Sequence, residues 1–358
     1  MNKPAGVAFI GAGFISFLHI IAIRSNPNTK LVAVASRSKG MAENRARIFN
    51  ADCYTFDELD KMLARRDIDI AYVQSPNSAH ARHAVAALKA GKHIVIEKPM
   101  TVTLKEAEEI VSAAKNAGVE IGYAENQVFA PVVMKARELV ADGAIGKVKR
   151  VTAFCGHSGP SKAGWFWKPQ FSGGGANIDL GPHTLETSLY LAGKPPIKRV
   201  RSCAMTKSDD GAIDVKAEMI LESEDGIELS VTSSWLETED NFWYEVSGEK
   251  GDLKCVFAPV PQFLTLLPKG GEPEDIDFPG RFDLHLDKYI ASSGYLGQLD
   301  HFEECFRKGV TPLESGIDGK NVLRILAAAY LSAARGQPVE LASAIPADKT
   351  PIELWLNR

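Results

Sequence analysis

Two patterns of apolar and polar positions follow each other repeatedly along residues 6–125. Short apolar runs, typical of buried strands, are separated by stretches in which apolar residues recur at helical spacing. The expected strands are 7–10, 31–35, 70–74, 93–97 and 120–123, and the expected helices are 15–24, 41–49, 78–90 and 104–117. This alternation predicts an α/β fold, with a doubly wound parallel sheet that helices cover on both faces.

The last of these helices has sequence signals at both ends. Thr103 and Glu106 have the spacing of a capping box, in which each side chain accepts a hydrogen bond from the backbone of the other residue. Gly118 follows the last helical residue, and glycine readily adopts the left-handed conformation that ends many helices. We therefore expect a helix with defined ends at 104–117.

The pattern changes after residue 125. A helix at 131–142 precedes runs in which apolar and polar residues alternate, which is typical of an antiparallel sheet with one face in water. The expected strands are 148–154, 198–205, 215–221, 227–235 and 242–247, and the later helices are 184–192, 296–306 and 320–335. The sequence thus predicts two domains, 1–125 and 126–358. The second is an α+β domain with an open, mostly antiparallel sheet, whose C-terminal helix packs back on the first domain.

The apolar run at 5–23 raises the alternative of a signal peptide or a membrane anchor. Ser16 and His19 are its clearly polar side chains, and the run is almost long enough to span a bilayer. However, Gly11 and Gly13 lie where a strand would end, and a polar turn rather than a small-residue cleavage site follows the run. Strand, glycine turn, helix and second strand form a βαβ unit, so we expect this run to belong to a folded domain.

Composition and charge exclude several classes of protein. The chain has 358 residues, of which 45% are hydrophobic, and a net charge of −4 without a long basic run, so nucleic acid is not an expected partner. The five cysteines are far apart in sequence, which gives neither a zinc-type CxxC spacing nor a dense disulfide framework. We expect a reduced, cytoplasmic protein with neither a metal nor a membrane partner, in which the cysteines are buried packing residues.

The glycine motif between the first strand and the first helix predicts a dinucleotide site. Gly11 is expected to make the tight turn, and Gly13 to let the backbone approach a pyrophosphate at the helix N-terminus. Ser16 takes the place of the third glycine, which serves close helix–strand packing, and serine is small enough to substitute for it. Phe14 and Ile15, in the first helical turn, are also expected to contact the cofactor.

The end of the second strand sets the cofactor preference. A carboxylate there would bind the ribose hydroxyls of NAD, but this chain has Ser36 and Arg37, followed by Ser38 and Lys39. A hydroxyl beside cations suits the 2′-phosphate of NADP, so we expect NADP, with NAD as the alternative.

Two further stretches carry side chains suited to acid–base chemistry. Lys98 follows a predicted strand and precedes a proline that restricts its backbone, and strand ends are where ligands bind in such sheets. Asp179 and His183 are four residues apart, so on a helix they share one face, where a carboxylate can orient an imidazole and stabilise its charge.

His80 and His83 raise the question of a metal site. They are three residues apart, but no third ligand lies near them in sequence, so no metal is expected there. We interpret both as helix-surface or packing residues, with His80 near the cofactor.

Five motifs occur in order along nearly the whole chain. They are Gly11-Ala-Gly13, Ser75-Pro76-Asn77 with His80, Glu97-Lys98-Pro99, Gly173-Gly-Gly175 with Asp179 and His183, and a tail at 315–336. Together they resemble the glucose–fructose oxidoreductase and inositol dehydrogenase family (Gfo/Idh/MocA). The resemblance implies a Rossmann domain with tightly bound NAD or NADP, a second domain on an open sheet, and a sugar, sugar derivative or cyclitol as substrate. It also implies cofactor contacts from Ser75, Pro76, Asn77, His80, Glu97 and Lys98. Asn126 and Gln127 follow the last strand of the first domain, and we expect them to contact the cofactor or the substrate.

The resemblance further places Lys98, Asp179 and His183 in an active site. In oxidation, His183 would take the hydroxyl proton, Asp179 would stabilise the charged imidazole, and the Lys98 ammonium would bind the reacting oxygen; Lys98 and His183 are also able to exchange these roles. Two departures from the family pattern stand nearby. Pro182 is harmless in the first helical turn, so we expect that helix to start near Asn177 or Asp179, and Glu186 stands where the family often has aspartate.

Aromatic residues just before the glycine run complete the candidate substrate site. Trp165 and Trp167 are expected to line it, and His157 and Lys168 are candidates for further substrate contacts. The sequence thus predicts a dehydrogenase, with a glycosidase that uses transient oxidation, a dinucleotide-sensing protein without turnover, and an oxidoreductase that never releases its cofactor as alternatives. The half-wet second sheet predicts a homodimer or homotetramer.

Overall fold

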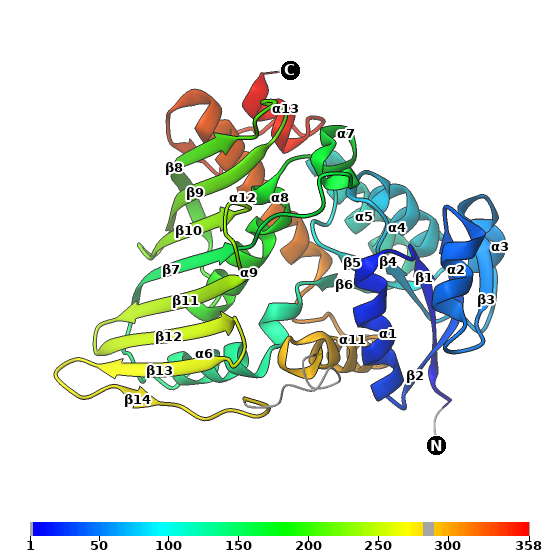
Figure 1. Ribbon diagram of the computed structural model, residues 1–358, viewed down its shortest axis with the longest axis horizontal. Helices are drawn as coiled ribbons and strands as arrows, with labels where there is room; N and C mark the ends of the chain where they lie inside the picture. The colour runs from blue at the N-terminus through cyan, green and yellow to red at the C-terminus, as the bar shows by residue number, and fades with distance from the viewer. Residues whose placement is uncertain (1–2, 282–289, 358) are drawn as a thin grey trace. The chain divides into compact units, whose positions relative to one another are not determined.

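The computed structural model describes residues 3–281 and 290–357 (Figure 1). These residues divide into two compact units. The first is drawn from Met1–Asn126 together with Tyr295–Lys320, and the second from Gln127–Gly294 together with Asn321–Arg358.

The first unit is built on a six-stranded parallel sheet with strand order β3-β2-β1-β4-β5-β6. Its strands are β1 (Ala5–Ile10), β2 (Thr29–Ser36), β3 (Asp52–Thr55), β4 (Ile70–Val73), β5 (His93–Glu97) and β6 (Ile121–Ala124). Its helices include α1 (Phe14–Ser25), α2 (Lys39–Ala46), α3 (Leu59–Leu63), α4 (His80–Lys89), α5 (Leu104–Ala117) and α11 (Tyr295–Lys308). The strand order reverses between β1 and β4. Because such crossovers are right-handed, α1 lies on one face of the sheet and α4 and α5 on the other, and ligands of such sheets bind beside the reversal.

The expected pattern of the first unit is confirmed in its main features. The five expected strands and four expected helices are present within a few residues, and the capping box of α5 forms, with Thr103 Oγ1 accepting from Glu106 N at 3.2 Å and Glu106 Oε2 accepting from Thr103 N at 3.2 Å. Gly118 ends that helix in the left-handed conformation at φ 66°. The sequence analysis missed β3 and α3, because Asp52–Thr55 is short, partly exposed and not apolar.

The apolar run at 5–23 is divided between a strand and a helix, as expected. Four consecutive residues of β1, at 7–10, are fully buried, and α1 buries its later turns. Within the part of the chain that the structure describes, no helix is long and apolar enough to cross a membrane.

The second unit is built on a nine-stranded mixed sheet with strand order β14-β13-β12-β11-β7-β10-β9-β8-β15. Its strands are β7 (Val148–Gly156), β8 (Ile197–Lys207), β9 (Asp214–Ser223), β10 (Glu228–Ser234), β11 (Asn241–Gly248), β12 (Gly251–Ala258), β13 (Phe263–Pro268), β14 (Glu274–Asp275) and β15 (Val339–Glu340). Its helices include α6 (Pro131–Ala141), α7 (Pro169–Ser172), α8 (Ala176–Asp179), α9 (Gly181–Ala192) and α13 (Pro351–Leu356), and α12 (Gly316–Arg335) continues into it from the first unit. All neighbouring strands are antiparallel except β7 and β10, which run parallel.

The five strands expected here are present, whereas β12 to β15 were not predicted. Burial alternates along the central strands, so that one face packs against helices such as α6 and α9 and the other remains partly exposed (Figure 1). The five cysteines are free thiols as expected, but Cys53 and Cys203 are only half-buried, which corrects the expectation that all five are buried.

Candidate active site

Gly11 closes the turn between β1 and α1 at the point where the strand order reverses. Its φ of +123° favours glycine, and a Cβ at this position would lie 2.4 Å from Gln74 O. Gly11 N donates to Ala35 O at 2.9 Å, and Gln74 Nε2 donates to Gly11 O at 3.2 Å. The glycine turn is therefore fixed between the ends of β2 and β4, with no room for a side chain.

The N-terminus of α1 follows directly. Gly13 is its N-cap and provides no side-chain hydrogen bond, and the first turn carries no acidic residue. The positive end of the helix dipole is thus not neutralised locally, which suits a phosphate ligand. Phe14 is 77% exposed at the start of the helix, and Ile15 is half-buried.

The end of β2 presents a hydroxyl and cations. Ser36 is 3% exposed, whereas Arg37, Ser38 and Lys39 are exposed. No carboxylate follows Ser36 at the position where an acidic residue would bind ribose hydroxyls.

Two histidines hold the loop that follows β4. His83 Nδ1 lies 2.9 Å from Ser75 Oγ, and His80 Nε2 lies 2.7 Å from Ser75 O. His80 Nδ1 also lies 3.0 Å from Pro99 O, so this ring joins the loop after β4 to the loop after β5. Both side chains are 1% exposed. Of the two expected alternatives, these histidines are therefore packing residues and not helix-surface residues. Burial lowers the pKa of His80 and lowers that of His83 to about 4, a shift to which the neighbouring Arg82 also contributes.

The residues after β5 point in different directions. Glu97 is 8% exposed, and its Oε1 lies 2.6 Å from Nε2 of the buried His19 on α1, so this carboxylate turns into the unit. Lys98, the next residue, is half-buried at the strand end. Burial and then the Glu97 charge raise the pKa of Tyr72 on β4 well above its ordinary value, which keeps that phenol neutral. The other expected cofactor residues in this unit are half-buried or buried: Pro76, Asn77 and Asn126.

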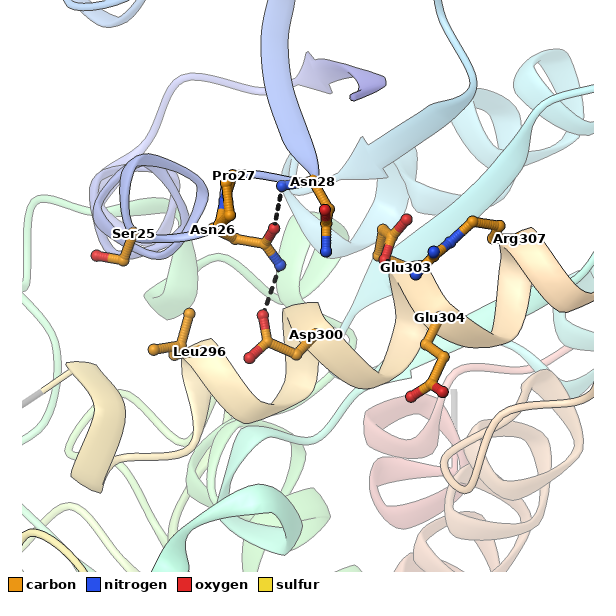
Figure 2. Close-up of a pocket in the computed structure, with 9 residues that line it drawn as sticks. All are labelled: Ser25, Asn26, Pro27, Asn28, Leu296, Asp300, Glu303, Glu304 and Arg307. Atoms are coloured by element: carbon orange, nitrogen blue, oxygen red, sulfur yellow. Dashed lines mark hydrogen bonds and ion pairs between the residues drawn. The ribbon is translucent and has the colours of Figure 1, made fainter. Parts of the chain in front are cut away.

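A cavity of about 320 Å³ in the first unit lies away from these loops (Figure 2). It is bordered by the turn between α1 and β2 and by α11, and Asn26 Nδ2 donates to Asp300 Oδ1 there at 2.5 Å. Glu303 and Glu304 add negative charge to its lining, which Arg307 only partly offsets. The cavity is at the opposite end of α1 from the glycine turn, and its charge does not suit a phosphate ligand.

In the second unit, a buried carboxylate explains the glycine run. Asp214 is fully buried and accepts hydrogen bonds from Gly175 N at 2.8 Å, Asn177 N at 2.7 Å and the Tyr330 hydroxyl. A Cβ on Gly175 would lie 1.7 Å from Asp214 O, and one on Gly174 would lie 2.5 Å from the Tyr330 hydroxyl. The run is therefore glycine because it packs against Asp214 and Tyr330, and this packing sets the start of α8. Burial raises the pKa of Asp214, against the effect of its three hydrogen bonds.

Asp179, at the end of α8, lies beside side chains from two strand ends. Trp235 Nε1 donates to Asp179 Oδ2 at 3.1 Å, and His157 Nε2 lies 3.5 Å from the same oxygen. His157 follows β7 and Trp235 follows β10, and because these strands run parallel their ends meet at one edge of the sheet. Gly159 N donates to His157 Nδ1 at 2.9 Å, so the neutral ring carries its proton on Nε2, facing Asp179.

The two expected tryptophans have different surroundings. Trp167 Nε1 donates to Pro160 O at 2.9 Å, and its ring lies 5.1 Å from that of Trp235, which connects it to Asp179. Trp165 stacks on Phe166 at 4.0 Å, and both tryptophans are half-buried. The structure thus brings Trp167 into the surroundings of Asp179.

The helix that carries His183 is interrupted. The sequence analysis expected one helix starting near Asn177 or Asp179, but α8 ends at Asp179, and α9 starts at Gly181 with Pro182 in its first turn. The expected position of this proline is confirmed, and the break before it corrects the helix start, because a ring without an N–H cannot continue a helix. His183 is half-buried, and the Tyr244 hydroxyl, which donates to Gln127 Oε1 at 2.6 Å, lies 3.3 Å from its backbone carbonyl oxygen.

Glu186, the departure from the family pattern, is 2% exposed, and Lys194 Nζ lies 2.9 Å from its Oε1.

Sequence reasoning missed Trp235 and Asp214, because no local motif marks either residue. Only the long-range pairing of strands brings Trp235 to Asp179 and Asp214 to the glycine run. Lys98 belongs to the first unit, and Asp179 and His183 belong to the second. Among residues 3–281 and 290–357, no group of three or more His, Cys, Asp or Glu side chains is placed to hold a metal ion.

Family models match both parts of the chain. The model described as the oxidoreductase family with an NAD-binding Rossmann fold, GFO_IDH_MocA, matches residues 5–124. The model described as the GFO/IDH/MocA C-terminal domain matches residues 133–254.

Several relatives of the chain are dehydrogenases of sugars or cyclitols. The chain is 29% identical to scyllo-inositol 2-dehydrogenase (NAD(+)) of Bacillus subtilis over 95% of its own length and 97% of that enzyme. It is also 29% identical to the NADP(+)-dependent scyllo-inositol 2-dehydrogenase of the same organism, over 76% of this chain and 82% of that one. D-glucoside 3-dehydrogenase of Escherichia coli is 31% identical, but the match spans 58% of this chain and 59% of that enzyme.

A solved structure has the same fold. The crystal structure of aldose-aldose oxidoreductase from Caulobacter crescentus, complexed with glycerol, aligns with a TM-score of 0.84 and 25% identity, over 94% of this chain and all of that one.

Proposed function

The chain belongs to the Gfo/Idh/MocA family of oxidoreductases, and from this premise we propose that it is an NADP-dependent dehydrogenase acting on a CH–OH group of a sugar, sugar derivative or cyclitol. The observation that carries the proposal is Asp179, a half-buried carboxylate with one oxygen bound by Trp235 and facing His157. A carboxylate held in this way, four residues before the half-buried His183, is suited to stabilise a neighbouring acid–base group.

The residues at the end of the parallel sheet fit a dinucleotide. Gly11 leaves no room for a Cβ, and the first turn of α1 presents its N–H groups without a competing carboxylate. Gly11, Gly13, Phe14 and Ile15 would hold the pyrophosphate side of the cofactor. The remaining cofactor contacts are assigned to Ser36, Arg37, Ser75, Pro76, Asn77, Lys98 and Asn126. The side chains of His80 and Glu97, which were also expected to contact the cofactor, bind Ser75 O, Pro99 O and His19 inside the unit instead.

The preference for NADP rests on the end of β2. Ser36 and Arg37 stand where a carboxylate would favour NAD, and relatives of both preferences exist. When bound, the nicotinamide ring supplies the acceptor or donor of the hydride.

The proton is handled by the chain's own residues. In oxidation, His183 takes the hydroxyl proton as the C–H bond breaks, and Asp179 stabilises the resulting imidazolium. The Lys98 ammonium hydrogen-bonds to the reacting oxygen and stabilises its developing negative charge. In reduction, His183 returns the proton. Trp165 and Trp167 cover the apolar face of the substrate ring.

We also assign the protein to the cytoplasm and to a homodimer or homotetramer. The five thiols are free, which suits a reducing compartment. The partly exposed face of the nine-stranded sheet carries aromatic residues such as Phe154 and Trp243, stacked at 6.2 Å, which suits burial against another subunit. A monomer at micromolar concentration in light scattering would contradict this assignment.

The test of the function is a steady-state assay with NADP or NAD and a panel of sugars and cyclitols. We expect net cofactor reduction with at least one substrate, and a loss of about a hundredfold or more in kcat for His183→Asn. Lys98→Met should lose activity to a similar degree, and the exposed Lys61→Met is the matched control. Release of a glycosidic leaving group without net reduction would indicate the transient-oxidation glycosidase instead, and cofactor binding without turnover of any substrate would indicate a sensor.

A further inference from the structure

An arginine from α2 lies against the glycine turn. Arg45 Nε donates to Ser16 Oγ at 2.9 Å, and Arg45 Nη2 donates to Gly13 O at 3.2 Å. The Ser16 hydroxyl in turn donates to Gly13 O at 2.6 Å. Ser16 stands in the third place of the glycine motif, where a glycine would have no hydroxyl to accept this bond. The departure at this position therefore creates the attachment point for Arg45.

The attachment leaves part of the guanidinium available. Arg45 lies over the Phe17 ring, with 5.8 Å between its Cζ and the ring centroid, which further fixes its orientation. Nη1 makes no hydrogen bond to any described residue, and within the described chain no carboxylate forms an ion pair with Arg45. A half-buried, oriented guanidinium with an unused donor and an unneutralised charge is well suited to a phosphate.

The position of this cation indicates which phosphate. Gly11 N donates to Ala35 O, so the turn that holds Arg45 lies directly beside the end of β2, where Ser36 and Arg37 stand. In dinucleotide folds the ribose of the adenosine half lies at this end of the second strand, and an arginine nearby accommodates its 2′-phosphate. Ser36 is 3% exposed and has no hydrogen-bond partner for its hydroxyl among the described residues.

We propose that Arg45 is a cofactor-specificity residue, whose guanidinium, fixed on the glycine turn by Ser16, binds the 2′-phosphate of NADP together with Ser36 and Arg37. This inference rests on the proposed dinucleotide site and adds a residue to it that no sequence motif marks. Ser16 acts as a positioning residue, because it contacts the guanidinium and not the phosphate.

The experiment uses two fragments of the cofactor as probes: 2′,5′-ADP, which carries one phosphate on O2′ and one on O5′, and 5′-AMP, which differs from it only in lacking the 2′-phosphate. Binding of each to the full-length protein is measured by isothermal titration calorimetry, for the wild type, Arg45→Met, Ser16→Gly and the control Arg47→Met. Arg47 is exposed and follows the same helix, so it matches the change in net charge without touching the turn. Circular dichroism melting curves establish that each variant is folded.

We expect Arg45→Met to weaken the binding of 2′,5′-ADP by about tenfold or more, as for the loss of a charged hydrogen bond, and to change the affinity for 5′-AMP by less than about twofold. Ser16→Gly should give a smaller loss with the same selectivity, and Arg47→Met should change neither probe beyond a small, salt-dependent effect. Equal weakening of both probes by Arg45→Met would overturn the inference and leave Arg45 as a structural support of the turn. Equal wild-type affinities for the two probes would overturn it while the dehydrogenase proposal stands, and binding of neither probe would overturn both.

Discussion

Trp235→Phe tests whether the donor to Asp179 matters for catalysis. Trp235 is 4% exposed, and its indole N–H lies 3.1 Å from Asp179 Oδ2. Phenylalanine keeps an aromatic ring against Trp167 but removes this donor. A hydrogen bond to an ionised group contributes about 1.5–3 kcal/mol, which corresponds to a loss of about tenfold to a hundredfold if the bond is needed fully in the transition state.

The assay is the pH dependence of kcat and KM on the best substrate found. We expect kcat to fall by about tenfold or more, with a smaller change in KM. The acidic limb of the kcat profile should move to higher pH, because the carboxylate has lost a donor that favours its ionised form. A role restricted to packing would lower stability without moving this limb.

Trp243→Phe is the matched control, because Trp243 is half-buried on β11 and stacks on Phe154 instead of reaching Asp179. If Trp235→Phe retains kcat within about twofold, or if Trp243→Phe loses as much, the reasoning about this hydrogen bond is refuted.

Three further predictions concern folding. The pKa of His83 is about 4, below its ordinary value of 6.5. Between these two pH values the native state therefore binds fewer protons than the unfolded state. The free energy of unfolding should fall as the pH drops through this window, and His83 should account for up to roughly 3 kcal/mol of the loss. His83→Asn should flatten that part of a urea-unfolding pH series, and an unchanged slope would show that His83 does not stay neutral. Gly175→Ala should fail to fold, or lose several degrees or more in Tm, because its Cβ would lie 1.7 Å from Asp214 O; wild-type melting would contradict the packing described for the glycine run. Tyr330→Phe should cost about 1.5–3 kcal/mol in chemical denaturation by removing a donor from the buried Asp214, and a cost near zero would mean that water replaces the hydroxyl.

Much of the first unit follows from sequence because its signals are local. Alternating apolar strands and helices, the Thr103 capping box and the glycine turn at Gly11 each depend on residues within about one element of each other. Strands that are short or partly exposed, such as β3 and β14, carry too few apolar residues to give such a signal.

The candidate site divides in the same way. The sequence by itself determined the fold class, the glycine turn and the set Lys98, Asp179 and His183 as candidates, because motif and resemblance both act on neighbouring residues. Only the tertiary structure decided what supports them: Trp235 reaches Asp179 across 56 positions and Tyr330 reaches Asp214 across 116. Hydrogen bonds between such distant positions depend on the pairing of strands and the packing of helices. No local pattern of apolar and polar residues records these contacts, so the surroundings that orient each functional side chain become visible only in the folded chain.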